Sequence, residues 1–119
     1  MIRVLYINDD PQELLIKEAF ESIGIRIELT VARTSQEAKK FLKNAAKFDT
    51  VFMDYKLDGY ETAVSSGLVK LCLENGFGVG KKPLIAYSQG HNDALMEAGC
   101  THSCGWFDLD VLICKLFTL

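Results

Sequence analysis

The chain has 119 residues, which is close to the commonest domain size, and we expect one domain over residues 1–119. Hydrophobic residues make up 49% of the sequence and charged residues 24%, a balance that excludes a disordered chain. The net charge of −3 disfavours nucleic acid and acidic membranes as partners. No apolar run is long enough to span a bilayer and the start lacks the features of a signal peptide, so we expect a cytoplasmic protein.

The cysteines form no CxxC pair and have no histidines at metal-ligand spacing, which argues against a zinc site. We expect reduced and mostly buried thiols, because free cysteine behaves as a small apolar residue. The four residues concerned are Cys72, Cys100, Cys104 and Cys114.

The chain opens with a predicted strand, helix and strand. Arg3–Ile7 is a short run of branched and aromatic side chains, typical of a buried strand. A helix follows, with Asp10 as its candidate cap, Pro11 as its first residue and Gly24 as its stop signal. Ile25–Ala32 alternates apolar and polar residues, which indicates a strand at the edge of a sheet.

The middle of the chain predicts a second helix and a third strand. Thr34–Glu37 has the pattern of a capping box, and apolar residues follow it at helical spacing as far as Ala45. Thr50–Met53 is the third strand, and it ends at Asp54.

The rest of the chain continues the alternation of strands and helices. Tyr55–Ser66 is polar and turn-prone, and Ser66 is the candidate cap of a helix that ends at Asn75–Gly76. The later elements are a strand at Leu84–Tyr87, a helix at Asn92–Ala98, a strand at Thr101–Cys104 and a helix at Asp108–Phe117.

Strands that alternate with helices at this spacing predict an α/β fold with a parallel sheet and helices on both faces. We expect a flavodoxin-like, doubly wound (βα)5 three-layer sandwich with the strand order 2-1-3-4-5. In that order, ligands bind outside the carboxyl ends of strands one and three. Asp9 and Asp10 follow strand one and Asp54 follows strand three, so their carboxylates should converge.

Carboxylates placed so close together need a cation or raised pKa values. Oxygen ligands of this kind suit Mg²⁺ or Mn²⁺. A carboxylate beside such an ion can attack phosphorus, because the metal stabilises the charge that builds on the phosphoryl oxygens. Asp54 is the candidate nucleophile, and it would become an acyl phosphate.

The sequence resembles the receiver domains of two-component response regulators over nearly its whole length. The residues that carry the resemblance are Asn8–Pro11 after the first strand, Val51–Asp54 and Leu57 at the third, Tyr87–Ser88 after the fourth, and Ala98–Gly99 before the fifth. The resemblance implies a phosphoacceptor at Asp54, phosphorylated by a histidine kinase, a phosphotransfer protein or a small phosphodonor. It also implies that Ser88 is the switch hydroxyl that turns toward the phosphoryl group.

The same resemblance implies a set of metal ligands. The acidic pair of the family matches Asn8 and Asp9, with Asp10 as a third acidic residue that could bind the metal, cap the helix, or do both. Asp54 and the backbone carbonyl of Lys56 complete the set. We expect no enzymatic activity beyond self-phosphorylation and autodephosphorylation on Asp54.

Three positions depart from the family pattern. The lysine usual at the end of strand five aligns with Trp106–Phe107, and its loss removes a charge-assisted contact worth roughly 1.5–3 kcal/mol. The usual aromatic switch residue aligns with Ser103. The segment after Asp54 is longer than usual before the helix-start glycine, which matches Gly67.

Two alternatives to the phosphoacceptor function stay open. A phosphorylation-independent pseudo-receiver would act as a protein-binding module. A small Mg²⁺-dependent phosphohydrolase is more distant, because the second aspartate of such enzymes is replaced by Lys56. Output is expected through a downstream protein partner or a homodimer, on the face of the fourth helix, fifth strand and fifth helix. His91 and His102 are interpreted as surface or loop residues without a catalytic role.

Overall fold

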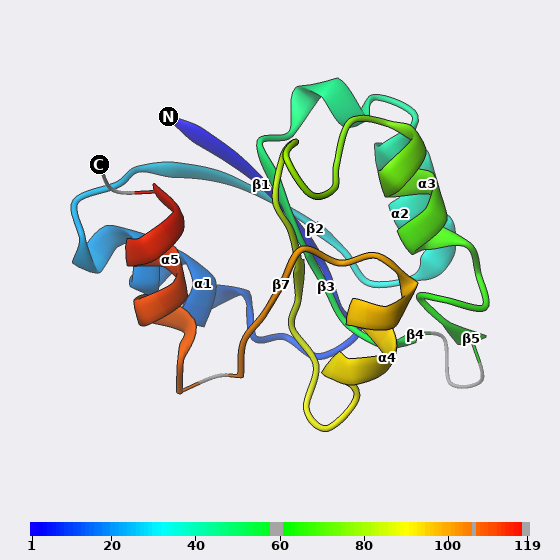
Figure 1. Cartoon of the computed structure of the whole chain (residues 1–119). Coiled ribbons are helices and arrows are strands. Elements are labelled where there is room, and N and C mark those ends of the chain that lie inside the picture. Colours follow the sequence, from blue (N-terminus) through cyan, green and yellow to red (C-terminus); the bar gives the residue numbers. More distant parts are fainter. Residues whose placement is uncertain (58–60, 106, 118–119) are drawn as a thin grey trace.

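The computed structural model describes residues 1–57, 61–105 and 107–117. A parallel sheet with the order β2-β1-β3-β6-β7 forms its centre (Figure 1). Its strands are β1 (Ile2–Ile7), β2 (Ile27–Ala32), β3 (Thr50–Met53), β6 (Leu84–Ala86) and β7 (His102–Ser103). Taken in chain order, this is the arrangement 2-1-3-4-5. The prediction of a flavodoxin-like fold is therefore confirmed, with β2 at the edge as expected.

Helices cover both faces of the sheet (Figure 1). One face carries α1 (Glu13–Ser22) and α5 (Leu109–Phe117), and the other carries α2 (Ser35–Leu42), α3 (Leu68–Glu74) and α4 (Asn92–Ala98). A 3-10 turn, η1 (Ala45–Lys47), follows α2 where the sequence pattern had suggested further helix. In the part of the chain that the structure describes, no helix has the length and apolar character needed to cross a bilayer.

The core explains why the first strand is apolar throughout. Val4 and Tyr6 pack with α1 and α5, and Leu5 and Ile7 pack with the helices of the opposite face. Successive side chains of a strand point to opposite faces, and here both faces are covered. All four side chains are fully buried. Of the cysteines, Cys72, Cys100 and Cys104 are buried and Cys114 is exposed.

The first helix begins later than the sequence indicated. α1 starts at Glu13, and its N-cap residue is Gln12, without a side-chain cap. The Asp10 N–H instead donates to the side-chain oxygen of Asn8 at 2.8 Å, and the Gln12 N–H donates to the Asp10 carbonyl at 2.8 Å. These bonds hold residues 8–12 in a turn, so the prediction of Asp10 as the helix cap is wrong.

The predicted caps of α2 and α3 have different outcomes. Thr34 caps α2, because its hydroxyl oxygen accepts the Glu37 N–H at 3.1 Å. Ser66 does not cap α3, since its hydroxyl donates to the Ala63 carbonyl at 3.4 Å. The N-cap residue of α3 is Gly67, whose φ of 79° lies in the left-handed region that glycine tolerates best.

The segment after Asp54 contains more regular structure than predicted. β4 (Lys56–Leu57) pairs antiparallel with β5 (Glu61–Thr62), outside the central sheet. The Ala63 N–H donates to the Tyr55 carbonyl at 2.8 Å beside this pair. The long segment between β3 and α3 is therefore partly organised as a short hairpin beside the end of β3 (Figure 1).

Candidate functional site

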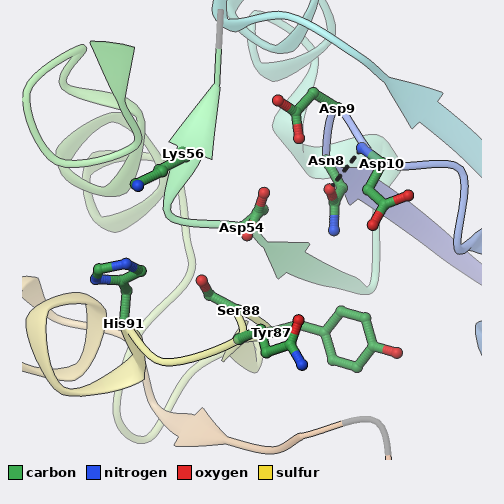
Figure 2. Close-up of a pocket in the computed structure, with 9 residues that line it drawn as sticks. Asn8, Asp9, Asp10, Asp54, Lys56, Tyr87, Ser88 and His91 are labelled. Carbon is green, nitrogen blue, oxygen red and sulfur yellow. Dashed lines mark hydrogen bonds between the residues drawn. The ribbon is translucent and has the colours of Figure 1, made fainter. Parts of the chain in front are cut away.

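A cavity of about 200 Å³ lies at the carboxyl end of β1, β3 and β6. It is lined by residues of the segments that follow these strands, namely Asn8, Asp9, Asp10, Asp54, Lys56, Tyr87, Ser88, Gln89 and His91. Figure 2 shows the Asp54 side chain between Asn8 and Asp9 on one side and Ser88 on the other. The structure thus brings together all the site residues that the sequence predicted.

The residues that follow β1 form an acidic loop, which we define as residues 8–12. Asn8 is buried, with 5% of its surface exposed, and its side-chain oxygen accepts the Asp10 N–H (Figure 2). This bond uses one lone pair of the Asn8 oxygen and leaves the second available. Asn8 therefore shapes the loop, while Asp9 and Asp10 remain exposed and line the cavity.

Asp54 is fixed at the end of β3 by the sheet itself. Its N–H donates to the Ile7 carbonyl at 2.9 Å, which places it directly beside the start of the acidic loop. Burial raises the pKa of Asp54 to about 6, and the nearby Asp9 and Asp10 add to the rise, while hydrogen bonds from the Tyr55 backbone and the Ser88 side chain lower it. The hydrogen bonds that the chain supplies to the Asp54 carboxylate therefore do not offset its burial and the neighbouring negative charges.

Ser88 is held by a residue that the sequence analysis did not single out. Its N–H donates to the side-chain oxygen of Asn92 at 2.8 Å, and the Asn92 amide donates to the Cys104 carbonyl at 3.2 Å. Asn92 thus links the segment after β6 to the segment after β7. An asparagine at the start of a helix is a common local feature, so the sequence offered no signal for this link.

The hairpin register does not use the carbonyl of Lys56 for a bond between β4 and β5. Lys56 faces Thr62, and the bond from the Ala63 N–H to the Tyr55 carbonyl identifies this as a non-hydrogen-bonded pair of the antiparallel ladder. In such a pair, neither residue uses its own carbonyl across the ladder. The predicted role of the Lys56 carbonyl as a metal ligand is therefore compatible with the local backbone.

His91 has a place in the cavity that the sequence analysis did not anticipate. Its ring stacks on the ring of Tyr55, with centroids 4.6 Å apart and planes 15° apart. Tyr55 directly follows Asp54, so this contact brings the start of α4 against the end of β3. His102 lies elsewhere, and its Nδ1 is 2.8 Å from the Thr101 hydroxyl. A lone histidine in a loop gave no pattern from which the stacking could be predicted.

Two of the three departures from the receiver pattern lie at β7 and beyond. Ser103 is exposed, and Phe107 is 96% exposed. Trp106, at the position of the missing lysine, lies outside the described residues. Among the described residues that line the cavity, the one lysine is Lys56, which belongs to β4 and not to the strand-five side.

The donor atoms of the cavity fit a hard divalent cation. Asp9, Asp10 and Asp54, whose side chains carry carboxylate oxygens, are among the residues that line it. Within residues 1–57, 61–105 and 107–117, no three acidic, histidine or cysteine side chains are grouped closely enough to hold a metal by themselves. Mg²⁺ usually takes one or two carboxylates and keeps several waters, so this donor set suits Mg²⁺ or Mn²⁺ better than it suits zinc.

No known family profile matches the sequence, and no curated protein matches it. Solved structures do match. The receiver domain of the Francisella response regulator 1452 is 27% identical, with a TM-score of 0.66 over 97% of this chain and 93% of that one. The phosphorylated cyanobacterial phytochrome response regulator RcpA is 14% identical, with a TM-score of 0.75 over 98% of this chain and 94% of that one. The chain has the receiver-domain fold.

A third match places the same fold inside a longer protein. NtrX from Brucella abortus is 17% identical, with a TM-score of 0.69 over 97% of this chain but 26% of that one. A receiver domain of this size can therefore be one part of a larger chain. These matches support, at the level of the fold, the resemblance found in the sequence. A signalling domain is the general class of protein that this fold supports.

Proposed function

We propose that this receiver domain is a phosphoacceptor of a two-component system, with Asp54 as the phosphorylated residue and Mg²⁺ or Mn²⁺ as the cofactor. The observation that carries the proposal is the half-buried Asp54 carboxylate, which lies in one cavity with Asp9, Asp10 and Ser88. The raised pKa of Asp54 supports it, because a carboxylate that is poorly compensated by its own chain is ready to accept a cation.

Each residue then has a defined part. Asp9 and Asp54, the Lys56 carbonyl and, in addition, Asn8 and Asp10 would hold the cation. When bound, the cation supplies positive charge for the oxygens of the transferred phosphoryl group. Asp54 attacks phosphorus with a carboxylate oxygen, and the oxygen–phosphorus bond forms as the bond between phosphorus and the donor's nitrogen or oxygen breaks. The donor group leaves with the electron pair of that bond and takes up a proton.

Ser88 would report the modification to the rest of the domain. Its hydroxyl lies beside Asp54, and its backbone is tied through Asn92 to the segment after β7. A hydroxyl that turns toward a new phosphoryl group is a small two-position element that charge can bias. The proposal includes a histidine kinase or phosphotransfer protein as donor, and a downstream protein or a second copy as the receiver of the signal. We also propose that the domain is cytoplasmic.

The test is a titration with beryllofluoride, which mimics a phosphoryl group, in the presence of Mg²⁺. We expect chemical shift changes at Ser88 and Asn92 that vanish when Mg²⁺ is withheld and in Asp54→Ala. Asp49→Ala is the matched control. Asp49 precedes the first residue of β3, at the opposite end of that strand from Asp54, so this variant should respond like the unmodified chain. A response that persists in Asp54→Ala would overturn the proposal.

A second candidate is a phosphorylation-independent binding module. It is favoured by the lack of a lysine on the strand-five side of the cavity among the described residues. This candidate predicts no Mg²⁺-dependent response to beryllofluoride or acetyl phosphate, and it predicts partner binding that Asp54→Ala leaves unchanged. The titration above therefore separates the two functions.

A further inference from the structure

Arg33 lies directly after β2 and contacts the backbone of the acidic loop. The pairing of Ile7 with Ala32 in the sheet places Arg33 alongside Asn8. One guanidinium nitrogen, Nη1, donates to the Asp10 carbonyl at 3.1 Å and to the Asn8 carbonyl at 3.5 Å. Arg33 is thus connected to two carbonyls of the segment that carries the predicted metal ligands.

The Asp10 carbonyl is a convergence point of the loop. It accepts the Gln12 N–H at 2.8 Å, Arg33 Nη1 at 3.1 Å and the Tyr6 hydroxyl at 3.4 Å. Asp10 is also one of the residues that line the cavity. Arg33 therefore holds the loop through carbonyl oxygens and not through the carboxylates that the proposed cation site needs.

The second nitrogen of the same guanidinium joins the loop to the first helix. Arg33 Nη2 lies 2.6 Å from Glu13 Oε1, in the first turn of α1, and the two side chains are only 35% and 25% exposed. The hydrogen bond from Arg33 lowers the pKa of Glu13, so this carboxyl stays charged near neutral pH. A planar guanidinium can bridge two groups in this way, whereas the single ammonium of lysine acts as a point charge.

We propose that Arg33 is a positioning residue that holds the acidic loop in the shape that binds a divalent cation. This inference rests on the proposed function, because it concerns the cation site of that function. Arg33 itself does not line the cavity. It acts through the backbone of Asn8 and Asp10 and through its ion pair with Glu13.

The sign of the effect separates positioning from simple electrostatics. A positive charge near the site repels a divalent cation, so if charge alone mattered, removal of Arg33 would strengthen Mg²⁺ binding. Positioning predicts the opposite result. Without Arg33 the loop samples other shapes, and Mg²⁺ binding weakens because the loop must be ordered when the cation binds.

The experiment measures Mg²⁺ affinity by calorimetry in the full chain. We expect Arg33→Ala to weaken binding about five- to tenfold, the order of the cost of immobilising a flexible segment on binding, and Arg33→Lys to restore it only in part. Glu13→Gln should weaken binding by less. Arg3→Ala is the matched control, because Arg3 forms a looser ion pair with Asp49, 3.8 Å apart, and belongs to the start of β1, at the far end of that strand from the acidic loop.

A second measurement does not depend on the cation. The ¹⁵N heteronuclear NOE of the Asp9 and Asp10 amides should fall in Arg33→Ala and stay unchanged in Arg3→Ala. If the unmodified chain bound no Mg²⁺, the proposed function would fail, while the NOE would still judge the role of Arg33. If Arg33→Ala bound Mg²⁺ as tightly as the unmodified chain, or if its NOE values were unchanged, the positioning role would be wrong.

Discussion

The two halves of the sheet support the candidate site to different degrees. β1 pairs with β2 along all six of its residues, whereas β7 is two residues long and pairs with β6 only over that length. The long half, which comprises β2, β1 and β3, carries the acidic loop and Asp54, and we call it the framework half. The short half, β6 and β7, carries Ser88 and two of the three departures from the receiver pattern, while the third, the longer segment after Asp54, follows β3. The carboxylate side of the site is therefore part of the framework of the fold, while the hydroxyl side depends on individual contacts such as that of Asn92.

The largest expected effect tests the framework half. Phe52 lies in β3, is fully buried, and makes edge contacts with Phe20 and Tyr87 at centroid distances of 6.5 Å and 5.9 Å. Phe52→Ala should lower the free energy of unfolding by about 3–5 kcal/mol, because it leaves a cavity among these rings. Urea unfolding measures the loss. The same change at the 96% exposed Phe107 should stay within about 0.5 kcal/mol, and equal losses at both positions would contradict the contrast between the halves.

A substitution in the short half should have the next largest effect. Gly99 precedes β7 with a φ of 130°, and an added Cβ would lie 2.5 Å from Leu73 Cδ1. Gly99→Ala should therefore lower stability by about 2–3 kcal/mol, through backbone strain and displacement of Leu73. Gly24→Ala is the control, because Gly24 has a φ of 78° and nothing within 4 Å of an added Cβ. It should lose only about 1 kcal/mol, measured by thermal unfolding of both variants.

Much of the difference between the two halves of the sheet could be predicted from the sequence, because hydrophobic periodicity and the position of each strand in the chain are local properties. The apolar runs and the helical spacing predicted the strand order, and Thr50–Met53 and Asn92–Ala98 were placed with the bounds that the structure has. The gathering of Asp9, Asp10 and Asp54 followed from the order of the strands, since parallel strands end at the same edge of a sheet.

The remaining features depend on contacts between distant segments. Asp10 was assigned to a cap because it precedes a proline, yet the side chain of Asn8 holds it in a turn. The bridge from Arg33 to Glu13 spans two elements, and the stacking of His91 on Tyr55 joins two loops. No local pattern encodes such pairs. The sequence analysis had no signal for these contacts, which lie around the site.

A smaller effect concerns the charge of Asp54, in the framework half. Its pKa is raised to about 6, so the folded chain binds a proton more tightly than the unfolded chain, whose value is about 3.9. The carboxylate therefore destabilises the fold as pH rises from about 4 to 6, and this penalty is complete above pH 6. Asp54→Asn should raise stability by about 1–2 kcal/mol at pH 7.5, a value reduced for solvent screening in an open cavity.

The same comparison at pH 4 supplies the control for Asp54→Asn. Both chains are then close to neutral at this position, and their denaturation midpoints in metal-free buffer should nearly coincide. Added Mg²⁺ at pH 7.5 should stabilise the unmodified chain and not the variant, which would reverse their order. A variant that is equally stabilised at both pH values would show that burial of charge is not the cause.

The smallest expected effect compares two tyrosines on either side of the boundary between the halves. The Tyr87 hydroxyl, just after β6, is buried and has no hydrogen-bond partner among the described residues. The hydroxyl of Tyr6, in β1, donates to the Asp10 carbonyl. Tyr87→Phe should leave stability unchanged or raise it by up to about 1 kcal/mol, because it removes a desolvated hydroxyl. Tyr6→Phe should lower it by a similar amount, because a contact of the acidic loop is lost. Paired urea titrations read the opposite signs, and a loss of stability in Tyr87→Phe would mean that this hydroxyl does have a partner in solution.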